Sequence, residues 1–467
     1  MTANLPVIPE NITVHLGAPS ASAENVTVPF VDYIKNVASS EIYPTWPVST
    51  LRANILAQIS FALNRIYTEY YPARGFDFDI TNVTAYDQSF VPGRDIFENV
   101  GMIVDDIFNN YIRRQGVIEP LFAQYCNGTT STCDGLSQWG SAALGEQGVN
   151  SIDILRNYYG NNLELVTDAP IQSVGQSLPD PPLRQGSTGN DVRTLQLRLN
   201  RVSVNFPTIP KIYPENGLFG NSTEQAVRKF QQLFNLNVDG IVGKATWYEL
   251  ARLWAGVKKL NELTSEGVRY EEVANQFPGN FSGGEEGRQV GILQYYLAFL
   301  AEYQSAIQAP VVTSVYDENT RASVESFQRA YDLPVTGVVD VTTWNALYDA
   351  YIGIIDSLPE AAFYGSIRPY PGLPLSVGAR GQEVIYLQEY LNAIARVYTE
   401  IPTVTVDGMF GPATEAQVRA FQQFVGLPVD GVAGLDTWYA IGDVYGDTEG
   451  GLYRSEGQYP GYEVGAE

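Results

Sequence analysis

The chain of 467 residues is too long for one ordinary hydrophobic core, because domains usually hold about 100 to 200 residues, so several domains are expected. Apolar residues make up 45% of the chain and charged residues 17%, a balance typical of folded protein. With 28 basic against 52 acidic residues, the formal net charge is -24. Such a chain offers no basic surface for nucleic acid or for anionic lipid, which argues against both as partners.

The start of the sequence lacks the pattern of a signal peptide and that of a membrane span. No basic residue precedes Lys35, and Pro6 and Pro9 interrupt the opening residues. We therefore expect neither export by the standard route nor a membrane-spanning segment.

Histidine and cysteine usage limits the chemistry that is open to the chain. His15 is the only histidine, so a zinc site with several His ligands is impossible, and a Ser-His-Asp or Cys-His site would depend on this one residue. Cys126 and Cys133 close a short loop, for which a single disulfide and a reduced pair both remain open. We expect no metal and no cofactor.

Residues 1–170 are expected to form a mixed α/β domain. The segments Ile12-Thr13-Val14 and Val26-Thr27-Val28 are typical of strands, whereas residues 51–70 carry apolar residues at helical spacing. Residues 171–182 end in Leu178-Pro179-Asp180-Pro181-Pro182, which predicts an extended linker after this domain.

One unit is then repeated three times, as an alignment of three Phe-Gln pairs reveals. Each pair is followed seventeen residues later by a tryptophan, is preceded eleven residues earlier by an aromatic residue, and has a Leu-Gln pair further upstream. These anchors are Phe230-Gln231, Phe327-Gln328 and Phe421-Gln422; Trp247, Trp344 and Trp438; Phe219, Tyr316 and Phe410; and Leu195-Gln196, Leu293-Gln294 and Leu387-Gln388. Four anchors that keep register three times predict three copies of one structural unit.

Each copy is expected to form three helices, with the Phe-Gln pair in the second and the tryptophan in the third. The residues before these two helices change between copies but remain accepted N-caps, and a turn separates the two helices. The predicted caps are Gly220, Asp317 and Gly411 for the second helix, and Gly243, Asp340 and Gly434 for the third. The predicted turns are Asp239-Gly240, Thr336-Gly337 and Asp430-Gly431.

The expected fold class is multidomain α+β, with an N-terminal mixed α/β domain followed by three small all-α three-helix modules. The expected modules are residues 183–255 (module 1), 282–352 (module 2) and 375–446 (module 3). Residues 256–281 and 353–374 connect the modules, and residues 447–467 are expected to form a flexible tail.

The repeats resemble the small peptidoglycan-binding domain that occurs in tandem on bacterial wall hydrolases and spore proteins. The stretch from Asp407 to Thr414, followed by Phe421-Gln422 and Thr437-Trp438, matches the pattern of that domain almost throughout. Module 1 matches nearly as well, whereas module 2 lacks the glycine after Tyr316 and the Asp-Gly turn. The resemblance implies peptidoglycan as the partner.

The aromatic anchors of the repeat are expected in the core, because regularly spaced aromatic residues are usually buried. Contacts with glycan or peptide are instead expected from the loop between the first and second helices. Tyr213, Asn216 and Asp407 are the candidates there. A copy that only spaces the array is the alternative to binding by all three.

Three segments of the N-terminal domain resemble the stage II sporulation protein D family, which includes lytic transglycosylases and amidase enhancers. They lie at residues 33–63, 79–90 and 136–160, and the third, with Leu136-Ser137-Gln138-Trp139-Gly140, is the most specific. The resemblance implies that Glu41 acts as both catalytic acid and base. Ile59 and Ser49 stand where the family usually has arginine and glutamate.

Two further alternatives concern single residues of this domain. Glu41 is also compatible with an ordinary acidic residue in the first turn of a helix capped by Ser39 or Ser40. Trp139 is compatible with stacking on sugar or with a place in the core.

Two functions therefore remain open. One is a non-catalytic peptidoglycan-binding protein of the bacterial cell wall or spore envelope. The other is a lytic transglycosylase that cleaves glycan strands with Glu41 and is targeted by the three modules. The resemblances imply a Gram-positive spore former in which the mother cell makes the protein, and the sequence leads to no prediction about self-assembly.

Overall fold

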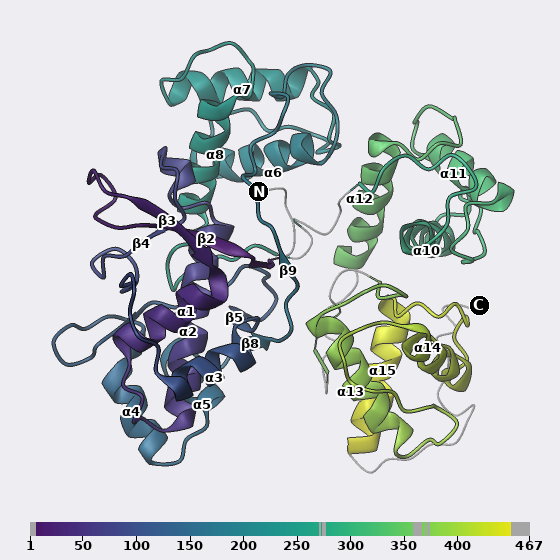
Figure 1. The fold of residues 1–467 in the computed structure, drawn as a ribbon. Helices are drawn as coiled ribbons and strands as arrows, with labels where there is room; N and C mark the ends of the chain where they lie inside the picture. The colour runs from purple at the N-terminus through teal and green to yellow at the C-terminus, as the bar shows by residue number, and fades with distance from the viewer. Residues whose placement is uncertain are drawn as a thin grey trace. The chain divides into compact units, whose positions relative to one another are not determined.

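The computed structural model describes residues 6–269, 272, 277–357, 367, 368, 370 and 374–449. The chain forms two compact units, Met1–Ala274 and Asn275–Glu467. The first contains the N-terminal domain and module 1, and the second contains modules 2 and 3 (Figure 1). The predicted fold class is confirmed, since mixed α/β structure is followed by helical modules.

Short strands frame the N-terminal domain. Strand β2 (Asn11–His15) pairs antiparallel with β3 (Asn25–Pro29) and parallel with β4 (Ile80–Thr81), which confirms the two strands predicted near the N-terminus. The other pairs are β1 (Ile8–Pro9) with β9 (Ile171–Gln172), β5 (Tyr111–Arg114) with β8 (Leu163–Val166), and β6 (Tyr125–Cys126) with β7 (Leu136–Ser137).

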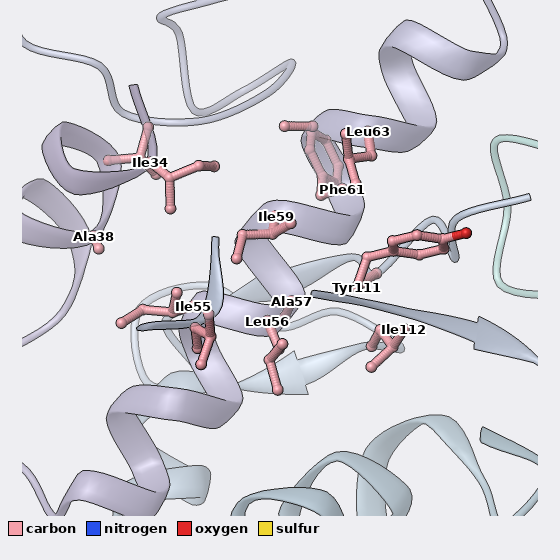
Figure 2. Packing of buried hydrophobic residues seen from close by; sticks show 14 of the residues in the cluster. Ile34, Ala38, Ile55, Leu56, Ala57, Ile59, Phe61, Leu63, Tyr111 and Ile112 are labelled. Carbon is pink, nitrogen blue, oxygen red and sulfur yellow. The ribbon is translucent and has the colours of Figure 1, made fainter. Parts of the chain in front are cut away.

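Helix α2 (Val48–Tyr67) is the centre of this domain, and it corresponds to the helix predicted at residues 51–70. Nearly all of its residues between Leu51 and Arg65 are buried, because other elements cover it on every side. Figure 2 shows Ile55 and Ile59 of α2 near Ile34 of α1 (Phe30–Glu41), with Ile112 of β5 close to the same helix. The remaining helical elements are η1 (Pro72–Arg74), α3 (Glu98–Ile107), α4 (Gln138–Glu146) and α5 (Ser151–Tyr159).

Each module has the three helices that the repeat predicts. They are α6 (Asn190–Asn205), α7 (Asn221–Leu233) and α8 (Lys244–Val257) in module 1; α10 (Arg288–Tyr303), α11 (Glu318–Ala330) and α12 (Val341–Ser357) in module 2; and α13 (Gln382–Ala395), α14 (Pro412–Val425) and α15 (Leu435–Glu449) in module 3. The predicted caps stand directly before the second and third helices of every module. Asp317 and Asp340 cap with their carboxylates, which accept the N–H groups of Thr320 and Thr343 at 2.8 Å.

The aromatic anchors occupy the cores, as expected from their spacing. Phe230 and Trp247 are fully buried in one cluster, and Phe421 and Trp438 are fully buried in another. Phe327 and Trp344 are buried in module 2. Isolated antiparallel bridges at equivalent places, such as Leu183 with Val242 and Leu375 with Ala433, tie the segment before the first helix to the turn before the third.

Module 1 packs directly on the N-terminal domain within the first unit. Ser177, from the segment predicted as a linker, is buried, and its hydroxyl contacts both Glu69 of the N-terminal domain, at 2.5 Å, and the indole N–H of Trp247, at 2.9 Å. After α8, the chain returns to the N-terminal domain, where the Asn64 amide donates to the carbonyl oxygen of Leu260 at 2.9 Å. The two parts of this unit therefore share a hydrogen-bonded interface.

Some sequence predictions concern residues outside the described ones. Most of the connector at 353–374 and residues 450–467 of the predicted tail belong to this group. None of the helices in the described part of the chain combines the length and the apolar character needed to span a bilayer.

Candidate functional site

Glu41 is the last residue of α1, so the interpretation of Glu41 as a residue in the first turn of a helix is wrong. Ser39 and Ser40 lie inside the same helix and do not cap its start. The helix begins earlier, at Phe30, because Phe30, Ile34 and Val37 form a buried apolar stripe upstream.

Three donors surround the Glu41 carboxylate. One oxygen accepts the Tyr125 hydroxyl at 2.5 Å and the Gln58 side-chain amide at 2.9 Å. The other oxygen accepts the backbone N–H of Ser89 at 2.7 Å. Gln88 extends this network, since its amide donates to the Tyr125 hydroxyl at 3.0 Å and its side-chain oxygen accepts the Tyr33 hydroxyl at 2.9 Å.

The surroundings of the Glu41 carboxyl group favour its protonated form more strongly than water would. Burial raises the pKa of Glu41 above its ordinary value of 4.5, and the hydrogen bonds from Tyr125, Ser89 and Gln58 oppose that rise. Burial and the neighbouring Glu41 charge in turn raise the pKa of Tyr125. A carboxyl group in this setting can hold a proton at a higher pH than an exposed glutamate, which is what a general acid requires.

Three aromatic rings form a cluster that begins two residues after Glu41. The ring centroids of Tyr43, Trp46 and Trp139 lie 5.2 to 5.4 Å apart. Trp46 is buried, whereas Tyr43 is 53% exposed and Trp139 is 42% exposed. Trp139 therefore contacts other rings while keeping part of its own ring available to a ligand such as a sugar.

A disulfide and a backbone hydrogen bond hold the loop that follows Tyr125. Cys126 and Cys133 form a disulfide, which decides between the two states that the sequence left open. The carbonyl oxygen of Asn127 accepts the backbone N–H of Trp139 at 3.2 Å. This loop thus connects the residue that bonds Glu41 with the exposed aromatic ring.

Residues of all three segments with the family resemblance meet around this network. Gln88 and Ser89 come from the second segment, and Trp139 comes from the third. The side chain of the neighbouring Asp87 is buried, and its carboxylate pairs with Arg65 at 2.8 Å. Ile59 is fully buried in the core, and therefore its position offers no charge to the site.

Sequence reasoning missed Gln58 and Tyr125, although both donate to Glu41. A glutamine and a tyrosine that lie 17 and 84 residues away from Glu41, respectively, carry no local pattern, so only the fold brings them together.

Two buried glutamines hold the loops of each module, and they belong to the Leu-Gln and Phe-Gln pairs. In module 3, the Gln422 amide donates to the carbonyl oxygen of Val432 at 3.0 Å and to the Thr437 hydroxyl at 3.1 Å, while its oxygen accepts the N–H of Gly431 at 2.9 Å. Gln231 and Gln328 make the same three contacts in modules 1 and 2. Gln196, Gln294 and Gln388 hold the loop between the first and second helices in a similar way.

The candidate ligand contacts lie on that same loop. Tyr213 is 87% exposed. Asn216 and Asp407 occupy equivalent turns, where their side-chain oxygens accept the N–H groups of Leu218 at 3.0 Å and Met409 at 2.9 Å. Asp407 also accepts the Gln388 amide at 3.0 Å. Tyr213 is thus open to a ligand, whereas Asn216 and Asp407 already support their turns.

Within the described residues, no group of three or more His, Cys, Asp or Glu side chains is arranged to hold a metal ion.

Comparison with known families identifies the three modules. Residues 188–250, 286–347 and 380–441 each match the family described as "Putative peptidoglycan binding domain". The three copies predicted from the repeat are therefore confirmed, the divergent module 2 included.

Curated relatives share short parts of the chain. A zinc D-Ala-D-Ala carboxypeptidase of Streptomyces albus G is 32% identical over 103 residues, which are 22% of this chain and 36% of that protein. An N-acetylmuramoyl-L-alanine amidase of Bacillus licheniformis is 40% identical over 77 residues, 16% of this chain and 20% of that protein. A spore cortex-lytic enzyme of Bacillus cereus is 47% identical over 72 residues, 15% of this chain and 26% of that protein. The chain thus spans well under two thirds of each of these relatives.

Proposed function

We propose that this chain is a peptidoglycan-binding protein of the bacterial cell wall or spore envelope. The observation that carries the proposal is the threefold match to a peptidoglycan-binding domain, supported by the same glutamine-held loops in all three modules. Peptidoglycan is a polymer with repeating sites, so several weak modules on one chain give a high combined affinity. Tyr213, Asn216 and Asp407 are the proposed contacts.

The location and the domain boundaries form part of the same proposal. The amidase and the spore cortex-lytic enzyme, both from Bacillus species, support a Gram-positive cell wall or spore envelope. We propose residues 1–170 as the N-terminal domain, and residues 183–255, 282–352 and 375–446 as the modules.

The test is co-sedimentation of the full chain with purified sacculi. We expect the chain to pellet with sacculi and to remain in solution without them. Tyr213→Ala is expected to weaken binding, with Tyr86→Ala, an exposed tyrosine outside the modules, as the matched control. A full chain that stays in the supernatant at every sacculus concentration would exclude the function.

A second candidate function is cleavage of glycan strands by the N-terminal domain, as in a lytic transglycosylase. It is favoured by the raised pKa of Glu41 and by the exposed rings of Tyr43 and Trp139 nearby. One carboxyl group suffices for this chemistry, because it protonates the glycosidic oxygen and then accepts the proton of the sugar's own hydroxyl as that oxygen closes the anhydro ring. Water does not take part in the cleavage.

Mass spectrometry of digested sacculi tests this candidate. The wild type is expected to release anhydro-muropeptides and Glu41→Gln to release none, while Glu98→Gln, at an exposed acid of the same domain, behaves as the wild type. Equal products from the wild type and Glu41→Gln would remove Glu41 from the chemistry. Sacculus binding without any cleavage would leave the protein as a binding protein alone.

A further inference from the structure

A cavity of about 450 Å³ lies between modules 2 and 3, inside the second unit. One wall consists of the second half of α10 and the loop that follows it, including Phe299 and Pro310. The opposite wall is the loop between α14 and α15, including Leu427 and Pro428. The walls are therefore largely apolar and suit an aliphatic chain.

The side chain of Tyr295 joins modules 2 and 3 beside this cavity. Tyr295 of α10 accepts the backbone N–H of Leu435, the first residue of α15, at 3.0 Å. Its ring also lies against Gly434, where an added Cβ would come within 2.0 Å of the Tyr295 hydroxyl oxygen. Tyr295 lines the cavity as well, so the contact that joins the modules also shapes the site.

Three carboxyl groups face the cavity, and no Lys, Arg or His is among the described residues that line it. Asp430 is engaged in its own turn, where it accepts the Gln422 amide at 2.6 Å and the N–H of Val432 at 2.9 Å. Glu302 and Asp436 are partly covered and partly open to solvent, and among the described residues neither has a hydrogen-bond or ion-pair partner. The cavity therefore carries negative charge that none of the described residues neutralises.

The pKa values agree with this geometry. Burial raises the pKa of Asp436, and the charge of Asp430 adds to the rise. Burial likewise raises the pKa of Glu302, with further contributions from Asp436 and Asp430. A bound cation would relieve this repulsion.

The fold itself does not require acidic residues at these places. The position of Glu302 is taken by Val204 in module 1 and by Arg396 in module 3, when the first helices are aligned. The position of Asp436 is taken by Ala245 and Thr342 in the other two modules. The acids at this junction are thus a feature of the cavity and not of the repeat.

We propose that this cavity binds the side-chain ammonium group of the diamino-acid residue in peptidoglycan stem peptides, with the alkyl chain against the apolar walls. Glu302 and Asp436 would pair with the ammonium group. A metal ion fits less well, because no described group of three or more side chains is arranged as a metal site. The inference rests on the proposed peptidoglycan binding and assigns to module 2 a direct part in it.

The experiment compares native sacculi with sacculi whose free amines have been acetylated, using the full chain. Acetylation removes the positive charge while the glycan stays intact. We expect the wild type to bind acetylated sacculi about tenfold more weakly, as is typical of a lost charged contact. The double variant Glu302→Gln/Asp436→Asn is expected to bind both preparations at that weaker level. Glu286→Gln/Glu400→Gln has the same change in net charge at exposed acids outside the cavity, and we expect it to bind as the wild type does.

The outcomes separate this inference from the proposed function. Equal binding of the wild type to native and acetylated sacculi overturns the cavity assignment and leaves peptidoglycan binding in place. A double variant that binds as the wild type does, with an unchanged thermal unfolding curve, also overturns it. No binding of the wild type to either preparation excludes peptidoglycan binding and the cavity site together.

Discussion

Gln422 illustrates how much of a module depends on single buried side chains. It is fully buried and joins α14 to the turn before α15, and to α15 itself, through four hydrogen bonds. In Gln422→Leu, the N–H of Gly431 is left without an acceptor in the interior, and the carbonyl oxygen of Val432 keeps only the N–H of Gly434, at 3.0 Å. Because an unpaired buried group costs about 1 to 3 kcal/mol and the other hydrogen bonds of the Gln422 amide are lost as well, we expect module 3 to lose about 2 to 4 kcal/mol of stability.

The neighbouring Gln423 is exposed and supplies the matched control for this prediction. Gln423→Leu is expected to change stability by less than about 0.5 kcal/mol. Hydrogen exchange of residues 427–437, read by mass spectrometry, reports the local opening free energy. Equal protection in the two variants would show that the hydrogen bonds of Gln422 do not hold this turn.

Glu119 makes the stability of the first unit depend on pH. It is only 3% exposed, and burial raises its pKa from 4.5 to about 7, although Val268 and Ser265 donate hydrogen bonds to it. Because the folded state favours the protonated form, the contribution of this group to stability is complete below pH 4.5 and is lost as the pH rises towards 7. Stability is therefore expected to fall across this interval.

Glu119→Gln is expected to remove that dependence, because an amide can accept the N–H of Val268 and donate to Ser265 without titrating. The comparison is best made between about pH 5.5 and about pH 8, where the wild type should lose about 2 kcal/mol more stability than the variant. Urea unfolding of the full chain at both pH values measures the difference. Parallel losses in the two proteins would contradict the assignment.

At the level of residues, the sequence allowed the prediction of those features that leave a local pattern. The caps Asp317 and Gly411 follow from short-range rules, and the buried Trp247 follows from spacing. The contacts of Glu41 with Tyr125 and Gln58 could not be foreseen, because they depend on how distant segments pack. The hydrogen bonds of the repeated glutamines could have been predicted in kind. A polar residue that stands beside a core anchor in three copies is expected to be buried, and a buried amide needs hydrogen-bond partners.

At the scale of elements, the start of α15 is fixed by a neighbouring module. Gly434 precedes α15, and Tyr295 of α10 lies where its Cβ would be. In Gly434→Ala the tyrosine must move, which is expected to destabilise the packing of modules 2 and 3 by about 1 to 3 kcal/mol. Thermal unfolding of the full chain measures the loss.

Gly411 precedes α14 in the same module and has open space around its Cβ direction. Gly411→Ala therefore measures the effect of replacing the cap without any contact with Tyr295. Its loss of stability is expected to be well under half of that caused by Gly434→Ala. A similar loss in both variants would mean that the cap, and not Tyr295, sets the requirement for glycine at residue 434. The sequence predicted a cap at this position, but a contact with another module leaves no trace in the repeat pattern.

At the scale of the whole molecule, the three modules are not equivalent, although their internal contacts are. Module 1 shares a unit with the N-terminal domain, whereas modules 2 and 3 form the other unit. The repeat pattern predicted three similar domains, and it could not predict this division because the interface residues lie outside the repeated anchors. Ser177 and Leu260 are examples, since one precedes the module 1 repeat and the other follows it.

Ser177 is the residue through which the integrity of the first unit can be tested. Its hydroxyl lies between the Glu69 carboxylate and the Trp247 indole, so Ser177→Ala leaves both buried groups without that partner. We expect a loss of about 1 to 3 kcal/mol in the stability of the first unit.

In calorimetry of the full chain, module 1 of this variant is expected to unfold at a lower temperature than the N-terminal domain, whereas in the wild type the two unfold together. Ser173→Ala, an exposed serine of the same segment, should leave the transition unchanged. Separate transitions already in the wild type would show that the two parts are only neighbours and do not fold as one cooperative body.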